Sequence, residues 1–423
     1  MKILLAVSAI LLLSVSALFV AGGCDGGSGG AAPDNPVTRV DNPGTLTGIE
    51  WSVVATPVYP VTGSDGLVHL AYEIKFANVT GSATTVRIDS VEVVDPENDD
   101  RVISTVKNTA FDGTDITYKL RNFDVPITFG TANYSDMLGP GQFGVMYMTV
   151  TFENEEEVPR FLGHRVTMSL PDFPDRGTVT ATGGYTEVST DRAVVLSPPL
   201  KGDRWLDADG CCETIGLHRF VVNPIDGKLR LSERYAIDFV RLDEDGRLYT
   251  GDQSVLANWH YYGADIHSAA EGRVVGVLDG LPDQPPGQLP TDATIVTAGG
   301  NHVVVDIGGG RYAFYAHMIP GSITVKEGDF VKRGQHIGNL GNSGNTDGPH
   351  LHFHVMDSPA PLNSNGLPYV FDSWAYQGKV IGGSLEETND NLMAGNPAEV
   401  DITGNGSMKK EELPFTNDII GFE

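Results

Sequence analysis

The stretch from Gly338 to Met356 constrains the fold of this chain more than any other. It begins with a turn rich in glycine and asparagine and continues into the run HLHFHV at 350–355, where histidines alternate with apolar residues. Turn residues followed by alternation predict a loop that leads into a strand. Because side chains alternate faces along a strand, His350, His352 and His354 should share one face while the apolar residues face a core.

Three imidazoles on one strand face are difficult to explain by packing. Two histidines two residues apart on a strand hold their ring nitrogens close enough to share one metal ion. The same spacing also allows one ring to bind the metal while the other transfers a proton. The alternative is that the three histidines only form a polar face exposed to solvent. However, only His69 and His164 of the 11 histidines precede residue 200, and this uneven distribution favours a metal or catalytic role.

Residues 48–197 are predicted to be β-structure throughout. The run from Val68 to Phe76 alternates apolar and polar residues, and further short runs at 86–93, 145–152 and 166–170 continue the pattern between turns. Several short strands of this kind favour an antiparallel β-sandwich, which we expect to be immunoglobulin-like. No cluster of chemically useful residues occurs in this region, so it could be a binding module or only a spacer.

A domain edge is predicted at Pro198 and Pro199, because proline removes a backbone donor and stiffens the chain. Residues 198–380 are again rich in strands, with clear runs at 273–277, 302–307 and 311–317. Residues 381–423 are expected to form a C-terminal tail with an Asn-Gly turn between short strands. The whole chain is therefore predicted to be all-β.

The first 23 residues predict a secretory signal, with one lysine, an apolar run and a small-residue end. The apolar run is long enough for a transmembrane helix, but its end fits a signal better. It resembles a bacterial lipoprotein signal, which implies that Cys24 becomes the lipidated first residue and anchors the chain to a membrane. Residues 24–47 are rich in glycine, proline and aspartate and predict a flexible tether.

The formal net charge of −27 argues against nucleic acid or an anionic lipid surface as a partner, because both would repel the chain. With Cys24 assigned to lipid, only Cys211 and Cys212 remain, so no disulfide framework holds the protein together. Adjacent cysteines can form a vicinal disulfide or stay as thiols. A zinc cluster would need further cysteines.

An ordered set of short motifs carries a family resemblance. It consists of YAHM at 315–318, VKEGDFV at 325–331, GQ at 334–335, GNSG at 341–344 and PHLHF at 349–353. Over about residues 230–378 this set resembles the lysostaphin-type zinc metallopeptidases, which cut peptidoglycan cross-links. The resemblance implies that residues 198–380 form an antiparallel β-sheet peptidase domain that binds Zn²⁺ and acts on peptidoglycan peptides.

The resemblance also implies roles for individual residues. His352 would be a zinc ligand, while His317 and His350 would flank the activated water as the catalytic pair. Tyr315 lies on the expected strand face of His317 and would contact substrate. His354 is either structural or supports the metal site from behind, and the sequence leaves this open.

The two remaining ligands of the family, a histidine and an aspartate, have two candidate pairs. The run YAIDF at 235–239 looks like a variant of the family motif in which Asp238 is the ligand. Arg234 then occupies the usual histidine position, so the imidazole would come from His218. The other pair, His260 and Asp265, belongs to a motif with one residue too many. We prefer His218 and Asp238, since an unpaired carboxylate in an apolar strand would be costly.

Two imidazoles and one carboxylate would leave zinc with an open position for a water whose pKa falls towards about 7. His317 and His350 could then take the water's proton and stabilise the oxyanion. We therefore expect a lipid-anchored metalloendopeptidase of the cell envelope, on the periplasmic or outer-membrane side, whose N-terminal domain meets an envelope protein. The alternative from a different class is a non-catalytic module that binds the cell wall or activates other hydrolases.

Overall fold

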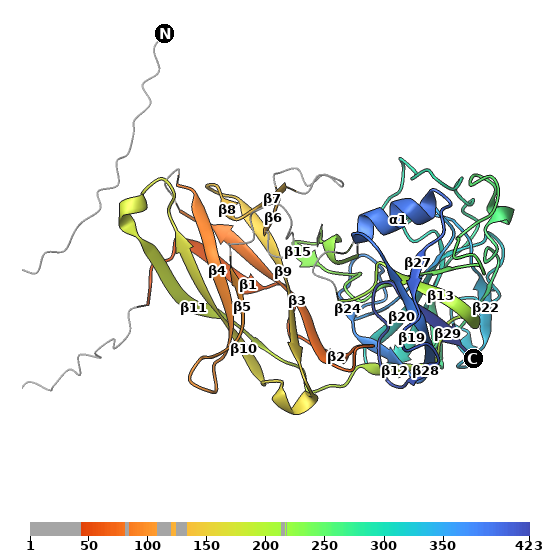
Figure 1. Ribbon diagram of the computed structural model, residues 1–423, viewed down its shortest axis with the longest axis horizontal. Coiled ribbons are helices and arrows are strands. Elements are labelled where there is room, and N and C mark those ends of the chain that lie inside the picture. The colour runs from red at the N-terminus through yellow and green to blue at the C-terminus, as the bar shows by residue number, and fades with distance from the viewer. Residues whose placement is uncertain (1–43, 81–83, 108–119, 124–132, 213–215, 217) are drawn as a thin grey trace, which may run out of the picture. The chain divides into compact units, whose positions relative to one another are not determined.

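The computed structural model describes residues 44–80, 84–107, 120–123, 133–212, 216 and 218–423. Residues 45–423 form one compact unit. Its elements are nearly all strands, which confirms the all-β prediction (Figure 1). The predicted signal, Cys24 and most of the predicted tether lie outside the described residues. In the part of the chain that is described, no helix is long and apolar enough to span a membrane.

Two antiparallel sheets form the N-terminal region. The first has the strand order β1 (Ile49–Val53), β3 (Val68–Asn78), β9 (Phe143–Phe152), β6 (Leu120–Phe123) and β7 (Asn133–Ser135), with β2 (Pro60–Thr62) beside β3. The second has the order β11 (Thr178–Glu187), β10 (Phe161–Ser169), β4 (Val86–Asp95) and β5 (Arg101–Lys107), with β8 (Met137–Leu138) beside β4. Side chains of both sheets share one core, including Leu70, Ile74, Val91 and Val166. The predicted sandwich is present, and its immunoglobulin-like connectivity stays a prediction.

Strand β3 is buried on both faces. Leu70, Tyr72 and Ile74 face the sandwich core, as their alternation predicts. Ala71 and Glu73 point the other way, yet neither is exposed to solvent. The outer face of this sheet is therefore covered by other parts of the chain.

A 12-stranded sheet organises the C-terminal region. Its strand order is β21 (Phe330–Val331), β18 (Gly272–Leu278), β19 (Asn301–Gly308), β20 (Arg311–Met318), β23 (Leu351–Met356), β16 (Ile237–Arg241), β13 (Gly202–Ala208), β29 (Asp418–Phe422), β26 (Trp374–Ile381) and β27 (Glu399–Asp401). Two further strands, β24 (Gly366–Leu367) and β28 (Ser407–Lys409), pair with β23 and β26. The three strands predicted at 273–277, 302–307 and 311–317 are confirmed as β18, β19 and β20.

Strand β23 has the two faces that its alternation predicts. Leu351, Phe353 and Val355 are fully buried in the apolar core. On the strand's other face, His352 lies directly opposite Asp238 of β16 and Ala316 of β20. Because directly opposed residues in antiparallel strands are close neighbours, this register brings a carboxylate beside an imidazole.

The remaining elements are short. Three strand pairs are β12 (Val194–Leu196) with β25 (Tyr369–Phe371), β14 (Asn223–Ile225) with β15 (Lys228–Arg230), and β17 (Asp265–His267) with β22 (His336–Asn339). Helical elements are α1 (Leu385–Met393) and the single turns η3 (Glu155–Glu157), η4 (Pro174–Arg176), η5 (His218–Phe220) and η6 (Leu256–Asn258). Cys211 and Cys212 are joined by a vicinal disulfide, which is one of the two predicted alternatives.

The segment 381–423 is not the separate tail that the sequence suggested. Its strand β29 lies between β13 and β26 in the central sheet. Ile419 and Ile420 of this strand are buried in the core that also holds Phe353. Apolar residues at the end of the chain thus complete the sheet that carries Asp238 and His352.

Candidate metal and catalytic centre

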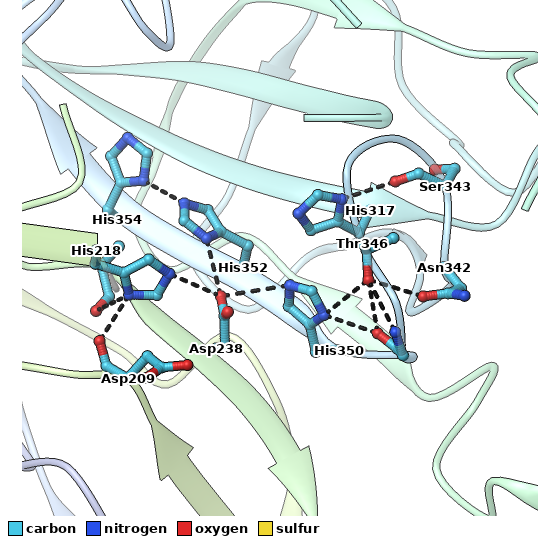
Figure 2. Close-up of polar contacts among 12 residues, drawn as sticks. Asp209, His218, Asp238, His317, Asn342, Ser343, Thr346, His350, His352 and His354 are labelled. Atoms are coloured by element: carbon cyan, nitrogen blue, oxygen red, sulfur yellow. Dashed lines mark hydrogen bonds and ion pairs between the residues drawn. The ribbon is translucent and has the colours of Figure 1, made fainter. Parts of the chain in front are cut away.

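Five side chains expected from the sequence to act together meet on one side of the neighbouring strands β16, β20 and β23 (Figure 2). The donor atoms of His218, Asp238 and His352 all lie within 4.8 Å of one another. Those of His317, His350 and His352 do so as well. His352 belongs to both groups, so the two groups form one continuous centre.

The Asp238 carboxylate is the hub of this centre. Its Oδ1 atom lies 3.3 Å from His218 Nε2, 2.9 Å from His352 Nδ1 and 3.4 Å from His350 Nε2. Two donors bound about 2.0–2.2 Å from a tetrahedral zinc ion lie roughly 3.3–3.5 Å apart. The spacing and the two-imidazole, one-carboxylate chemistry of His218, Asp238 and His352 therefore fit Zn²⁺.

Backbone carbonyls fix the orientation of three of the rings. The Nδ1 atoms donate to these carbonyls, His218 to those of Asp209 (2.7 Å) and Ala236 (3.1 Å), His317 to that of Ser343 (2.7 Å) and His350 to that of Gly348 (2.9 Å). Because a carbonyl only accepts hydrogen bonds, the proton of each neutral ring is assigned to Nδ1. Each Nε2 then keeps its lone pair for a metal ion or a proton.

His352 has the opposite arrangement. Its Nδ1 faces Asp238, and its Nε2 lies 2.8 Å from Nδ1 of His354. For Nδ1 to bind a metal, the proton must sit on Nε2 and be donated to His354. His354 is therefore placed to hold the ring of His352, which supports the second of the two roles that the sequence left open for it.

The turn at 341–344 carries the supports of His317. The carbonyl of Ser343 accepts from the His317 ring, and the Ser343 hydroxyl donates to the Met318 carbonyl at 2.7 Å. His317 has a φ of 61°, a left-handed conformation that costs a residue with a side chain about 1–2 kcal/mol. Backbone bonds to Gly299 and Gly341 hold it there. Strain of this kind often accompanies functional residues.

The same turn lies against the loop before β19 and leads to His350. At Gly344, with φ of +88°, an added Cβ would collide with the backbone of Gly300 and Ala298. Two residues further on, the Thr346 hydroxyl lies 2.8 Å from Asn342 Oδ1 and 3.3 Å from His350 Nδ1. The glycine- and asparagine-rich sequence thus allows the close approach that positions both rings.

Because these groups lie close together, they shift one another's pKa values. Burial alone would raise the pKa of Asp238, but His350 and His218 hold this pKa well below its usual value. Burial would lower the pKa of His218, but Asp238 outweighs it and raises this pKa to about 10. For His317, burial and the neighbouring His350 and His352 all lower the pKa, so the ring is neutral at pH 7.

The other candidate ligand pair has different partners. The His260 ring is bonded to the carbonyl of Arg241 at 3.2 Å. Asp265 accepts from the Asn339 amide at 2.9 Å and lies 3.5 Å from His336. Neither residue belongs to the centre around Asp238.

Tyr315 is not placed to contact substrate, in contrast to the expectation from its strand position. Its side chain is fully buried in the apolar core, its ring packs on Phe353, and its hydroxyl accepts from the Ala269 N–H at 2.7 Å. The expectation assumed regular alternation up to His317. The left-handed backbone at His317 breaks that alternation and turns its ring away from the side on which Tyr315 lies.

Part of the centre lies in a region that matches a known protein family. Residues 259–364 match Peptidase family M23. Over 65 residues the chain is 42% identical to the peptidoglycan DD-endopeptidase ShyA of Vibrio cholerae, and the match spans only 15% of each chain. The catalytic domain of the antimicrobial peptidase lysostaphin from Staphylococcus simulans is 20% identical, with 39% of this chain and 88% of that chain covered and a TM-score of 0.21.

A zinc containing peptidase from Vibrio cholerae is 14% identical, with 74% of this chain and 84% of that chain covered and a TM-score of 0.20. Independently of these structures, the family match identifies an M23 peptidase domain over residues 259–364, and M23 peptidases are zinc enzymes. The matched residues include His317, His350 and His352 but neither His218 nor Asp238. The upstream pair joins the centre only through the fold.

Proposed function

We propose that this protein is a zinc-dependent metalloendopeptidase that hydrolyses peptide cross-links of peptidoglycan. The observation that carries the proposal is that the His317 and His350 rings, each held through Nδ1 by a backbone carbonyl, lie beside the donor set of His218, Asp238 and His352. A module that only binds the cell wall would need neither of these oriented rings. Their retention supports catalysis over the non-catalytic alternative.

In this proposal His218 Nε2, Asp238 Oδ1 and His352 Nδ1 would hold Zn²⁺, which would polarise the scissile carbonyl and lower the pKa of the attacking water. In the neutral form of His350 or His317 the proton sits on Nδ1 and Nε2 has a lone pair, so either ring could take the proton of the attacking water. The imidazolium that forms can then donate a hydrogen bond to the oxyanion or pass its proton to the leaving amine. No nucleophilic serine or cysteine is required.

The relatives support the proposed substrate class and location. ShyA is named a peptidoglycan DD-endopeptidase, which supports cell-wall peptides as substrates of this chain. A peptidase of the cell wall works in the cell envelope, and the predicted signal with Cys24 would place it there on a lipid anchor. The partner expected for the N-terminal region stays a prediction.

Digestion of purified cross-linked muropeptide dimers by the full chain tests the proposal. We expect monomers to accumulate, to stop accumulating after chelation of the metal and to reappear when Zn²⁺ is restored. The matched control is His260→Ala, which alters a histidine outside the centre and should digest the dimers normally. Dimers that are bound but never cleaved by the zinc-loaded chain would favour the non-catalytic module instead.

A further inference from the structure

The segments that carry His218 and Asp238 are both tied to the N-terminal sandwich. Arg219 follows His218 directly, and Arg234 precedes Asp238 by four residues in the segment that leads into β16. Both guanidinium groups reach one carboxylate of β3, that of Glu73. Arg219 donates to Glu73 Oε1 at 3.0 Å, and Arg234 donates to Oε2 through Nε at 3.0 Å and through a terminal nitrogen at 2.6 Å.

This ion triad is buried completely. The Glu73, Arg219 and Arg234 side chains are 0%, 1% and 3% exposed. Burial would raise the pKa of Glu73, but Arg234 and Arg219 outweigh it and keep the pKa below its usual value. Because a buried charge without its partner is costly, the carboxylate fixes where both arginines lie.

Strand β9 adds a second tie to the segment before His218. The Thr149 hydroxyl accepts from Arg219 at 2.9 Å and donates to the carbonyl of Cys212 at 3.0 Å. Arg219 also donates to the carbonyls of Tyr72 and Met148, both at 3.1 Å. The sandwich therefore holds this segment on either side of His218.

Apolar contacts join the same two regions in addition to these hydrogen bonds and ion pairs. Val145 and Tyr147 of β9 form a buried cluster with Val222 and Leu231, which lie between His218 and Asp238 in the sequence. The outer face of the first sandwich sheet is thus occupied by the stretch that supplies the two upstream donors. A spacer or a freely docking module would leave this face free.

We infer that Glu73 is a positioning residue for the metal centre and that the N-terminal sandwich is a structural part of the site, required for its full affinity for metal. Glu73 itself touches neither metal nor substrate in this scheme. It sets the positions of Arg219 and Arg234, and through them the positions of the His218 ring and the Asp238 carboxylate. The inference rests on the proposed function, because it assumes that these two residues bind the metal.

Zinc affinity of the full chain, measured by competition with a chelator, tests the inference. Glu73→Gln should weaken zinc binding by about tenfold or more, as expected for a residue that orients metal ligands. Thr149→Val is a milder change of the same kind, and we expect it to weaken binding by roughly threefold. The visible absorption of the Co²⁺-loaded chain should change in both variants, because it reports the geometry of the ligands.

Two controls separate positioning from general stability. Thr151→Val makes the same substitution two residues along β9, where the hydroxyl contacts His69 and not Arg219. Val166→Ala removes buried side-chain volume from the second sheet of the sandwich. Both should keep the zinc affinity within about twofold of the unaltered chain, even where the melting temperature falls.

A folded Glu73→Gln chain with unchanged zinc affinity and cobalt spectrum would overturn the inference while leaving the proposed function intact. If Glu73→Gln does not fold, the comparison of Thr149→Val with Thr151→Val decides, and equal affinities overturn the inference. If the unaltered chain binds no zinc, or keeps its zinc in His352→Ala, the proposed function fails and the inference fails with it.

Discussion

Three imidazoles surround one carboxylate oxygen of Asp238, and the two nitrogens of each ring have different partners. The histidines predicted to be catalytic, His317 and His350, each have Nδ1 on a carbonyl and Nε2 facing the centre. The histidine predicted to be a ligand, His352, instead presents Nδ1 to Asp238. His350 and His352 thus present different ring nitrogens to Asp238 within one short motif, and His218, a proposed ligand, has the same arrangement as His350.

The first prediction tests the roles proposed for His350 and His352. His350→Ala should keep most of the zinc but lower the rate of muropeptide cleavage by about a hundredfold or more, because a general base is lost. His352→Ala should lose the zinc itself, because a ligand is lost. Zinc per chain by elemental analysis and cleavage rate are measured on the same samples. Equal zinc loss in both variants would show that the two roles are assigned wrongly.

The second prediction concerns pH. In the metal-free protein the pKa of His218 is raised to about 10, above the usual value of 6.5, so protonated His218 pairs with Asp238. This stabilisation is fully present below about pH 6.5 and is lost as pH rises towards about 10. Metal binding must displace that proton, so zinc affinity should rise by up to about tenfold per pH unit in this window.

Thermal unfolding of the chelator-treated chain tests the direction of this pH dependence. It is followed from about pH 6 to about pH 10, the range over which His218 is expected to lose its proton. The melting temperature of the metal-free protein should fall across this range. His218→Gln is the matched control, since it cannot be protonated and should show a weaker dependence. A melting temperature that rises with pH in the unaltered chain would contradict the pairing.

Single residues differ in how far the sequence predicts them. The motif around His350 and His352 is local, so its spacing already indicates shared chemistry. Whether His218 or His260 supplies the upstream imidazole depends on contacts across more than a hundred residues, which no local pattern contains. The hydrogen bonds from the rings to the carbonyls of Asp209 and Gly348 could not be predicted either, because every residue has a backbone carbonyl and the sequence does not show which one a ring will meet.

At the scale of elements, the turn at 341–344 tolerates little change. Gly344→Ala should destabilise the protein by roughly 3 kcal/mol and displace Ser343, the support of His317, because the added methyl meets backbone. Gly334→Ala is the matched control: its φ is also positive, +76°, but nothing lies within 4 Å of the added Cβ. It should cost only about 1 kcal/mol and leave cleavage unchanged.

Urea unfolding and the muropeptide assay compare these two variants. The expected pattern is a large loss of stability and activity for Gly344→Ala and a small loss of stability alone for Gly334→Ala. Similar losses in both would mean that the left-handed backbone, and not the close approach to Gly300, limits the turn.

Strands were predicted well where alternation was strict, as in β3 and β23. The helix α1 was not expected, although Ser384 and Glu387 form a capping box that announces its start. The place of β29 in the central sheet was missed for another reason. A short apolar strand at the end of a chain carries no signal about the strands it will pair with. Tyr315 shows the same limit, because regular alternation fails at a strained residue.

At the scale of the whole molecule, the predicted lipid anchor would decide where the proposed enzyme acts. Cys24 ends an apolar segment and precedes a tether rich in glycine and aspartate. Cys24→Ser should therefore release the protein from the membrane fraction of cells or block its processing, because the lipid cannot be attached. The control is Cys212→Ser, which should leave membrane attachment unchanged. A Cys24→Ser chain that is still processed and still sediments with membranes would exclude the lipoprotein interpretation.

The assembly of the site from distant segments is also a property of the whole molecule. The sequence of β3 predicts one apolar face, and the burial of Glu73 on the other face follows only from the segments that cover it. The sandwich could therefore be predicted as a fold but not as a neighbour of the proposed metal ligands. The sequence of residues 48–197 contains no cluster of chemically useful residues, so a spacer was one of its two interpretations.

The central claim is that His218, Asp238 and His352 form one metal site, and the zinc content of four purified variants tests it most directly. His218→Ala and Asp238→Ala should each come out with sharply reduced zinc, because each removes a donor of the centre. His260→Ala and Asp265→Ala should keep about one zinc per chain, like the unaltered protein, since a single tetrahedral site binds one ion. Zinc lost from the second pair and kept in the first, or kept in all four variants, would contradict the account.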